Sequence, residues 1–332
     1  MNGRAEQSAG AKLYRSALVW DMVWPLEPWC GNDYDKLPQF HAAGVNVISI
    51  TLAGDNHNVG EAMARVAAAR RWLSDNSDRY VPIVGTADVR RAEAEGKLGV
   101  AFHFEGTRCF ERNLDMIEAF YQLGVRHTLL AFNQSNSVGG GCGEAADGGL
   151  TRFGANVIRE MNRVGMIVDL SHTGYRTTME AMEIATRPVM FSHSNSAAVA
   201  PHFRNLQDDQ VQACAATGGI VGVSSASDYL GVRTSSPEAI FRHIDHYAGL
   251  VGARHVGLGL DIVFDNDVLN NWIRSRPAEW PGTDHPDWPG FNYARPDHYV
   301  RLTEIMVEHG YREADIRGIL GENFLNLCAA NW

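Results

Sequence analysis

Short apolar runs alternate with longer amphipathic segments along most of the chain. The runs are rich in β-branched and aromatic side chains, and each is about four to eight residues long, which is typical of buried strands. The longer segments repeat hydrophobic positions at three- and four-residue spacing, which predicts helices with one packed face. The predicted strands are Ala17–Trp20, Val45–Leu52, Val100–Glu105, Val125–Phe132, Met166–Ser171, Val189–Ser192, Gly219–Ser224 and His255–Asp261.

Strand and helix patterns follow one another without a break in composition. This alternation predicts an α/β fold in which residues 1–332 form one (β/α)8 TIM barrel domain. An open doubly wound sheet is the alternative, but no GxGxxG sequence follows the first strand. The predicted helices are Val59–Asn76, Asn113–Leu123, Phe153–Val164, Tyr175–Ala185, Leu206–Thr217 and Pro237–Val251.

Residues 265–297 follow the last predicted strand and are too long for an ordinary connection between a strand and a helix. The segment is rich in proline, tryptophan and tyrosine. The carboxyl ends of the strands form the catalytic mouth of such barrels. We therefore expect this segment to be a lid over the mouth or a contact between subunits.

Composition narrows the classes of partner. The formal net charge of −10 argues against nucleic acid or an anionic membrane as a partner. No signal-peptide pattern opens the chain, and no apolar stretch approaches the ~18 residues needed to span a bilayer. The five cysteines are scattered and form no CxxC motif, which favours reduced thiols. We expect a cytoplasmic protein that forms a homo-oligomer, a dimer or larger.

Candidate chemistry lies where three predicted strands end. Glu105 closes one apolar run, and His172 and His193 follow two others. Because parallel strands present their carboxyl ends on one side of a barrel, these three side chains can converge. Two imidazoles and a carboxylate are a common catalytic zinc set that leaves one position open for water. The alternative, in which each histidine only satisfies a buried loop, is less favoured for three such groups together.

Several motifs, in order along the chain, resemble the membrane (renal) dipeptidase family, a zinc-dependent branch of the amidohydrolase-like barrels. The resemblance runs from about Val100 to Asn326, and more weakly back to Ala17. It rests on Phe104–Gly106, Gly149–Gly154, Asp169–Thr173, Phe191–Ser194, Arg204–Asn205, His243–His246, His255–Asp261 and Gly321–Phe324. It implies a metal-dependent hydrolase that cleaves a dipeptide or another small amide bearing a free carboxylate.

The resemblance also implies roles for single residues. Members of the family hold two zinc ions that share one glutamate, to which Glu105 corresponds. His172 and His193 match the imidazoles of the second zinc. Arg204 matches an arginine that holds the carboxylate of the substrate, a task suited to a planar guanidinium. Asp261 matches the acid that transfers protons and contacts the substrate's amino group.

The sequence departs from the family at two places. The first strand of the family carries a His-x-Asp pair for the first zinc, whereas residues 20–24 here read Trp-Asp-Met-Val-Trp. Phe132 stands where the family has a histidine near the reacting carbonyl. We expect Phe132 and Trp24 to contact the substrate, and a large apolar group beside the scissile amide to be tolerated. The apolar residues behind this expectation are Trp20, Met22, Trp24 and Trp29.

Four residues are candidates to replace the missing ligands: Asp55, His57, His103 and Asp21. The alternative is a polar mouth without metal at these positions, in which Asp21 is a structural carboxylate. We expect one tightly bound zinc ion per subunit. The remaining functional alternatives are a repurposed, inactive barrel that binds a small carboxylate, and a metal-dependent enzyme that does not hydrolyse.

Overall fold

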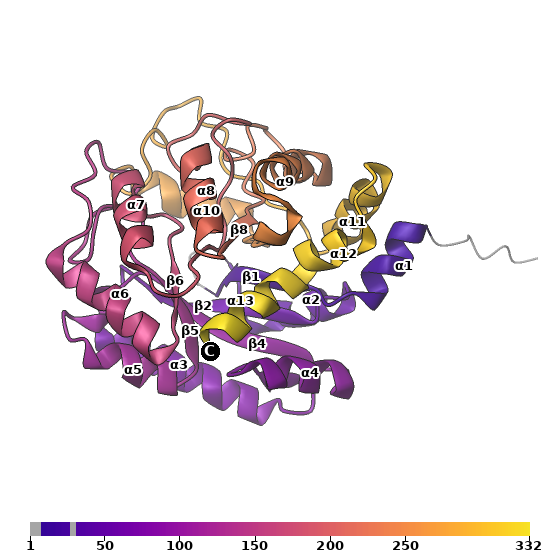
Figure 1. The fold of residues 1–332 in the computed structure, drawn as a ribbon, viewed down its shortest axis with the longest axis horizontal. Coiled ribbons are helices and arrows are strands. Elements are labelled where there is room, and N and C mark those ends of the chain that lie inside the picture. The colour runs from indigo at the N-terminus through magenta and orange to yellow at the C-terminus, as the bar shows by residue number, and fades with distance from the viewer. Residues whose placement is uncertain (1–7, 27–30) are drawn as a thin grey trace, which may run out of the picture.

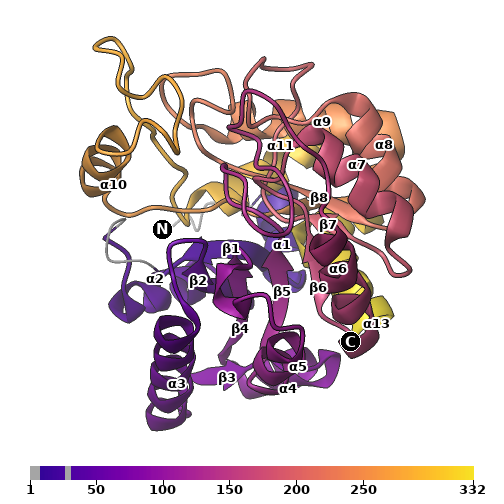
Figure 2. The same cartoon turned by 90° about the vertical axis from the view of Figure 1, so that its left-hand side faces the viewer.

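The computed structural model describes residues 8–26 and 31–332. Within them, eight parallel strands form a nearly closed barrel in the order β1-β2-β4-β5-β6-β7-β8-β9, and β3 pairs with β4 beside this path (Figures 1 and 2). This confirms the predicted (β/α)8 barrel. The strands are β1 Trp20–Pro25, β2 Val47–Gly54, β3 Tyr80–Pro82, β4 Leu98–Glu105, β5 Val125–Leu129, β6 Ile167–Asp169, β7 Met190–Phe191, β8 Ile220–Val223 and β9 Val256–Leu258.

Helices separate the strands, as the sequence pattern predicts. Figure 2 shows α10 and the chain that follows it on one side of the molecule, apart from α3, α4 and α5. The α-helices are α1 Ala9–Ser16, α2 Leu37–Ala42, α3 Val59–Asp75, α4 Thr86–Glu95, α5 Asp115–Gln122, α6 Arg152–Val164, α7 Tyr175–Ile184, α8 Asp208–Ala216, α9 Pro237–Val251, α10 Asn266–Arg274, α11 His298–Glu308, α12 Glu313–Arg317 and α13 Asn323–Asn331.

The first strand lies later in the sequence than predicted. It spans Trp20–Pro25 rather than Ala17–Trp20, so Asp21 lies inside the strand and not beyond its end. The Asp21 carboxylate is fully buried and accepts hydrogen bonds from the backbone N–H of Leu260, at 3.1 Å, and from the hydroxyl of Tyr299. A charged residue is tolerated in this buried strand because its acceptors are satisfied. Within the described part of the chain, no backbone ladder joins β1 to β9. The bond from Leu260 to Asp21 therefore connects β1 to the segment that follows β9.

Several elements were not predicted, among them β3 and α4. Strand β3 has only three residues, too few for a clear alternation, and it pairs Tyr80 with Leu98 at the edge of β4. Helix α4 is rich in charged residues and buries only Val89 and Ala92. Its weak apolar face explains why the periodicity of the sequence did not reveal it.

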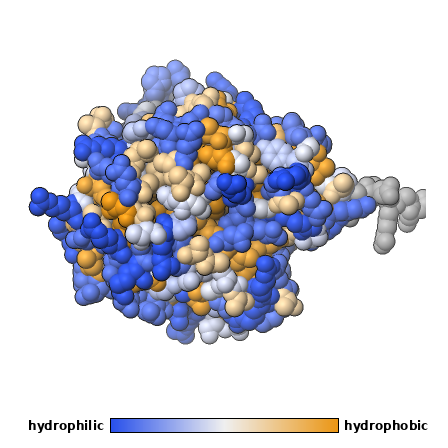
Figure 3. Space-filling model, in the orientation of Figure 1, coloured by the Kyte–Doolittle hydropathy of each residue, from blue (hydrophilic) through white to orange (hydrophobic). Residues whose placement is uncertain are grey.

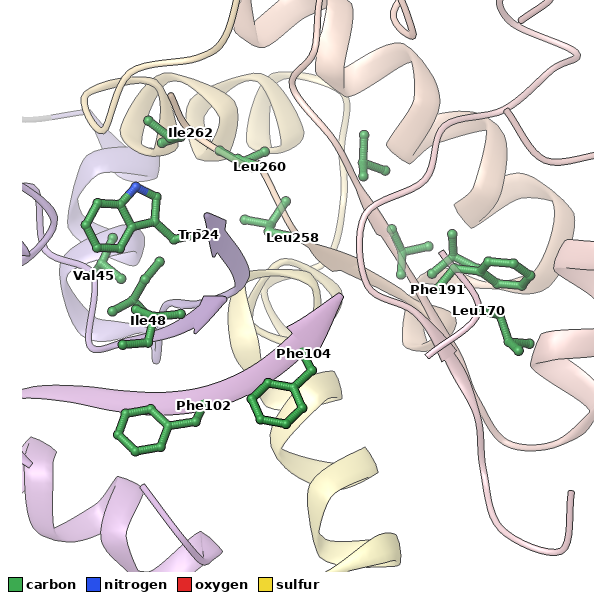
Figure 4. Close-up of a cluster of buried hydrophobic side chains, with 14 of the residues drawn as sticks. Trp24, Val45, Ile48, Phe102, Phe104, Leu170, Phe191, Leu258, Leu260 and Ile262 are labelled. Carbon is green, nitrogen blue, oxygen red and sulfur yellow. The ribbon is translucent and has the colours of Figure 1, made fainter. Parts of the chain in front are cut away.

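The hydrophobic side chains of the strands form two buried clusters. On β4, Phe102 and Phe104 belong to the cluster between barrel and helices, part of which is drawn in Figure 4, whereas His103 and Glu105 alternate with them and face inward. A second cluster includes Trp20 and is completed from the C-terminal helix by Phe324, whose ring centroid lies 4.6 Å from that of Trp20. Helix α13 runs across the strands in Figure 1.

The described residues contain no helix that is long and apolar enough to cross a bilayer. The face of the molecule in Figure 3 is mainly hydrophilic, with apolar residues scattered in small patches. Single exposed apolar residues are ordinary on such a surface.

Candidate active site

A small chamber of about 20 Å³ lies at the carboxyl ends of the strands. Four predicted site residues line it together, from the ends of β4, β6, β7 and β9: Glu105, His172, His193 and Asp261. They converge because each ends a parallel strand of one barrel or lies two or three residues beyond its end. A volume of this size corresponds to about one water molecule or ion.

The two histidines point their Nε2 atoms at each other across 3.0 Å. Nδ1 of His172 lies 2.7 Å from Oδ1 of Asn133, and Nδ1 of His193 lies 2.8 Å from the hydroxyl of Ser192. Burial lowers the pKa of both imidazoles well below the usual value, and the charge of Arg204 lowers it further. Both imidazoles are thus neutral, which is the protonation state in which histidine binds metal.

The carboxylate of Asp169, at the end of β6, fixes the backbone next to both histidines. Its Oδ1 accepts the N–H of Ser171 and the N–H of Ser192, each at 3.1 Å. Each of these residues directly precedes a site histidine. Oδ2 of Asp169 lies 3.2 Å from Nδ1 of His127 in the barrel interior. One buried carboxylate therefore sets the relative position of the two loops that carry His172 and His193.

Glu105 is held from the neighbouring strand. The hydroxyl of Thr51 donates to its Oε1 at 3.0 Å and lies 2.8 Å from Nε2 of His103. Because a hydroxyl has one proton to donate, Nε2 of His103 must be the donor to Thr51. His103, a candidate replacement ligand, thus supports Glu105 through Thr51.

Three residues at or beside the chamber adopt left-handed backbone angles: Asn133 with φ +56°, His172 with φ +62° and Asp261 with φ +58°. Such angles are uncommon for residues other than glycine and cluster at functional sites. Removal from water raises the pKa of Asp261 well above its usual value, and the negative charge of Glu105 raises it further. Asp261 is therefore suited to accept and keep a proton.

The other candidate replacement ligands are engaged elsewhere. The Asp55 carboxylate accepts hydrogen bonds from the backbone N–H of Thr107, Arg108 and Phe132 and from the amide of Asn136, so it ties three loops together. Gly106, with φ +149°, permits this approach, since a Cβ there would lie 2.3 Å from Oδ1 of Asp55.

His57 accepts the N–H of Gly54 within its own loop, and Asp21 takes part in the contacts between β1 and the segment after β9. Across residues 8–26 and 31–332, no group of three or more His, Cys, Asp or Glu side chains is close enough to hold a metal ion. The chemistry of the donors at the chamber nevertheless fits zinc, because two neutral imidazoles and a carboxylate line one small space.

Arg204 lies beside the histidines with 2% of its surface exposed. Its Nη1 donates to the hydroxyl of Ser194 at 2.8 Å, and its Nη2 donates to the carbonyl of His193 at 2.7 Å. Its Nε is buried without a hydrogen-bond partner among the described residues. The guanidinium therefore supports the His193 loop and keeps its Nε–H donor unused.

Aromatic side chains cover the chamber. The ring of Phe132 stacks on His172 with centroids 4.1 Å apart, and Trp280 meets Phe132 edge-on at 5.7 Å. Trp280 belongs to residues 265–297, which we call the cover segment and which contribute Leu269, Trp280 and Tyr293 to the chamber wall. Much of the apolar surface at the site thus comes from this segment and from Phe132, and Pro25, Tyr229 and Val263 supply the rest.

The tryptophans of the first strand lie elsewhere. Trp24 is fully buried and packs edge-on against Phe40 at 5.3 Å, within the core beside Ile48 and Ile262 (Figure 4). It does not line the chamber. Trp20 packs on Phe324 inside the second core cluster, and Trp29 lies outside the described residues.

Two larger hollows adjoin the chamber. A wide cleft of about 740 Å³ shares Glu105 and Phe132 with it, and a side pocket of about 270 Å³ shares His172 and includes Arg204. The wide cleft carries charged side chains of both signs: Asp55, Glu105, Arg108, Glu111, Arg112, Arg276 and Glu279. A substrate longer than the chamber therefore has space on both sides of the histidine pair.

The sequence did not reveal the residues that orient the ligands. Asn133 and Asp169 make the contacts that fix His172 and His193, yet neither matches a metal-ligand spacing. Both lie at or a few residues beyond the carboxyl end of a barrel strand, and Asp169 also opens the motif Asp169–Thr173, but neither signal indicates an orienting role.

Comparison with known proteins identifies the family. The family model for membrane dipeptidase, peptidase family M19, matches residues 12–267. The chain belongs to this family. It is therefore a member of a family of hydrolytic enzymes, as the motifs predicted.

An uncharacterized dipeptidase from Schizosaccharomyces pombe is 36% identical over 215 residues, which are 61% of this chain and 51% of that relative. The chain thus spans about half the length of this curated relative.

Solved structures share the fold. A Pseudomonas aeruginosa amidohydrolase is 26% identical with a TM-score of 0.89, and the match covers 98% of this chain and 99% of that one. A metallopeptidase from Rhodobacter sphaeroides, liganded with a phosphinate mimic of the dipeptide L-Ala-D-Ala, is 21% identical with a TM-score of 0.77. That match covers 95% of this chain and 99% of the other. These likenesses agree with the amidohydrolase-like barrel described above.

Proposed function

We propose that this protein is a zinc-dependent hydrolase that cleaves the amide bond of a dipeptide or another small amide bearing a free carboxylate. The observation that carries the proposal is the chamber in which Nε2 of His172 and Nε2 of His193 face each other at 3.0 Å, with Glu105 and Asp261 on its wall. Membership in the dipeptidase family and the dipeptide mimic bound to the Rhodobacter sphaeroides metallopeptidase support the choice of substrate.

Glu105, His172 and His193 would hold one zinc ion. Zinc bound in this way lowers the pKa of a coordinated water to about 7 and polarises a carbonyl oxygen. Asp55 and Asp21 have their acceptors occupied by N–H and O–H donors, which favours one metal per subunit over two.

The chain's own groups perform the remaining tasks. Asp261 accepts a proton at its carboxylate from the attacking water and returns it to the leaving amine, since its raised pKa makes the carboxylate a stronger base. Arg204 offers its unused Nε–H from the side pocket to the carboxylate of the substrate. Phe132 and the cover segment exclude water from the chamber.

The chamber itself is smaller than a dipeptide, so the substrate must extend into the wide cleft and the side pocket. Cleavage then requires that the cover segment moves to admit the substrate. The polar walls of the wide cleft favour a polar group there, whereas Phe132 and Trp280 favour an apolar group directly beside the scissile bond.

The deciding experiment is a metal count per subunit, followed by assays of metal-depleted and zinc-reloaded protein. The panel contains dipeptides, acylated amino acids and lactams. We expect one tightly held zinc ion and hydrolysis only in the reloaded sample. Two tightly held zinc ions would contradict the single site, and an inert reloaded protein would contradict the activity.

A second candidate function is a repurposed barrel that binds a small carboxylate without hydrolysis. The observation that favours it is the first strand, where Met22 and Val23 stand in place of metal ligands and are fully buried. Binding of a carboxylate ligand that Arg204→Ala abolishes, in a zinc-loaded protein without hydrolytic activity, would establish this candidate instead.

A further inference from the structure

Asn133 lies between the histidine pair and the cover segment. It is fully buried four residues beyond β5, with its backbone in the left-handed conformation at φ +56°. Its side chain makes two contacts in different directions. Oδ1 lies 2.7 Å from Nδ1 of His172, and Nδ2 donates to the backbone carbonyl of Glu279 at 3.0 Å.

The orientation of this amide follows from its partners. A carbonyl can only accept, so the NH₂ group of Asn133 must face Glu279 and the oxygen must face His172. The thiol of Cys142, 3.3 Å from Oδ1, also requires an acceptor there. His172 therefore carries its hydrogen on Nδ1, which leaves the lone pair on Nε2, the nitrogen that faces His193.

The cover segment makes further contacts with the same loop. Gln134 donates from Nε2 to the carbonyl of Ala278 at 3.1 Å, and Trp280 packs on Phe132 with centroids 5.7 Å apart. The backbone of Asn133 is fixed from the opposite side, because Gly143 donates to its carbonyl at 2.8 Å. A Cβ on Gly141 would lie 2.1 Å from the carbonyl carbon of Asn133. The side-chain amide of Asn133 is thus attached to a fixed backbone, and it loses its partner Glu279 only when the cover segment leaves.

We propose that Asn133 is a positioning residue that couples seating of the cover segment to the metal-binding form of His172. When the segment is seated, Glu279 orients the amide, and the amide holds the hydrogen of His172 on Nδ1. When the segment leaves, the amide can turn its NH₂ group toward Nδ1, which places the hydrogen of His172 on Nε2 and removes a metal ligand. The proposal rests on the proposed function, in which His172 binds zinc.

Coupling of this kind is reciprocal. If seating of the segment favours zinc, then zinc must favour seating by the same factor. The measurement is hydrogen exchange of residues 276–290 with and without zinc, together with zinc affinity from competition with a chromophoric chelator. The tautomer of His172 is read from its ¹⁵N chemical shifts in the metal-free protein.

Three variants separate the contact of Asn133 with His172 from its contact with Glu279. Asn133→Asp keeps an acceptor for His172 and loses the donor to Glu279, and aspartate tolerates the left-handed angle. Asn133→Gly removes both contacts without backbone strain. Gln134→Ala removes a neighbouring bond to the cover segment and leaves His172 untouched, so it is the matched control.

We expect zinc to slow exchange of residues 276–290 in the wild type and in Gln134→Ala, and to have no such effect in the two Asn133 variants. Zinc affinity should fall about 10- to 100-fold in Asn133→Gly, the usual effect of losing a group that orients a ligand, and stay within a few-fold in Asn133→Asp. Equal zinc-induced protection in wild type and Asn133→Gly would overturn the proposal.

The two proposals fail in different ways. If the wild-type protein binds no zinc, the proposed function is wrong. The metal-free samples still decide the role of Asn133, since the Nδ1–H form of His172 should dominate in the wild type and in Asn133→Asp but not in Asn133→Gly. An unchanged tautomer in Asn133→Gly would refute the link even in a protein that binds zinc.

Discussion

The carboxylate of Asp21 on β1 accepts the backbone N–H of Leu260, two residues beyond β9, at 3.1 Å. The hydroxyl of Tyr299 donates to the same carboxylate. Burial raises the pKa of Asp21 from 3.8 to about 7, although the hydrogen bonds from Tyr299, Val23 and Leu260 act in the opposite direction. This position joins the first and last strands of the barrel, so its protonation bears on the stability of the whole fold.

The first prediction concerns stability and pH. A raised pKa means that the folded protein binds a proton at Asp21 where the unfolded chain does not. The contribution of Asp21 to the free energy of unfolding is therefore greatest at low pH, and it falls as pH rises from 3.8 to about 7. We expect the wild type to lose stability relative to Asp21→Asn across this window, as measured by urea denaturation. Asp78 is exposed, so the variant Asp78→Asn is the control. A difference in the free energy of unfolding between wild type and Asp21→Asn that stays constant with pH would show that burial does not raise the pKa of Asp21.

The second prediction concerns Arg204. Arg204→Ala should raise KM for substrates with a free carboxylate by about 10- to 100-fold, the scale of a hydrogen bond to a charged group, and spare amidated analogues. Because Arg204 also binds the hydroxyl of Ser194, Ser194→Ala measures the structural share of the effect. An equal loss on amidated and free substrates would show that Arg204 only supports the His193 loop.

The third prediction concerns proton transfer. Asp261→Asn keeps the shape of the side chain, and asparagine tolerates φ +58°. Turnover should fall by about 10²- to 10⁴-fold, the usual scale of general acid–base catalysis, while the zinc content stays unchanged. Steady-state kinetics and metal analysis of the same sample provide the check. Full turnover in Asp261→Asn would assign the proton transfer to another group.

The fourth prediction tests the place of Trp24. Because its ring is fully buried against Phe40 and Phe264, Trp24→Ala should lower the free energy of unfolding by about 3–5 kcal/mol. Trp24→Phe should cost less and leave KM unchanged. A changed KM in a stable Trp24→Phe protein would restore the expectation that this residue contacts the substrate.

The barrel and the convergence of Glu105, His172 and His193 could be predicted because both follow from local patterns. Apolar runs mark parallel strands, and residues at their carboxyl ends meet on one side whatever the details of packing. The same argument placed Asp261 at the mouth. The role of Asp261, by contrast, came from the resemblance to the dipeptidase family.

Other features depend on contacts between distant segments. Asp21 resembled the end of a strand because its partners, Leu260 and Tyr299, lie more than two hundred residues away in the chain. Trp24 resembled a residue of the mouth, whereas its neighbours place it in the core. Short motifs do not encode the left-handed angles of Asn133 and His172, which arise when the loops pack together.

The contacts of β1 also bear on the order of folding. β1 pairs with β2 early in the chain, but Trp20 also packs against Phe324 and Trp332, and Asp21 binds Leu260 and Tyr299, so part of its packing comes from the last quarter of the chain. During synthesis β1 can pair with β2 early, whereas these distant contacts must wait until almost all of the described chain has left the ribosome. Contacts at such sequence separation slow folding, since a long loop must close before they form. Until then, the ring of Trp20 lacks Phe324 and Trp332, and the apolar surface left uncovered is open to a chaperone or a second nascent chain.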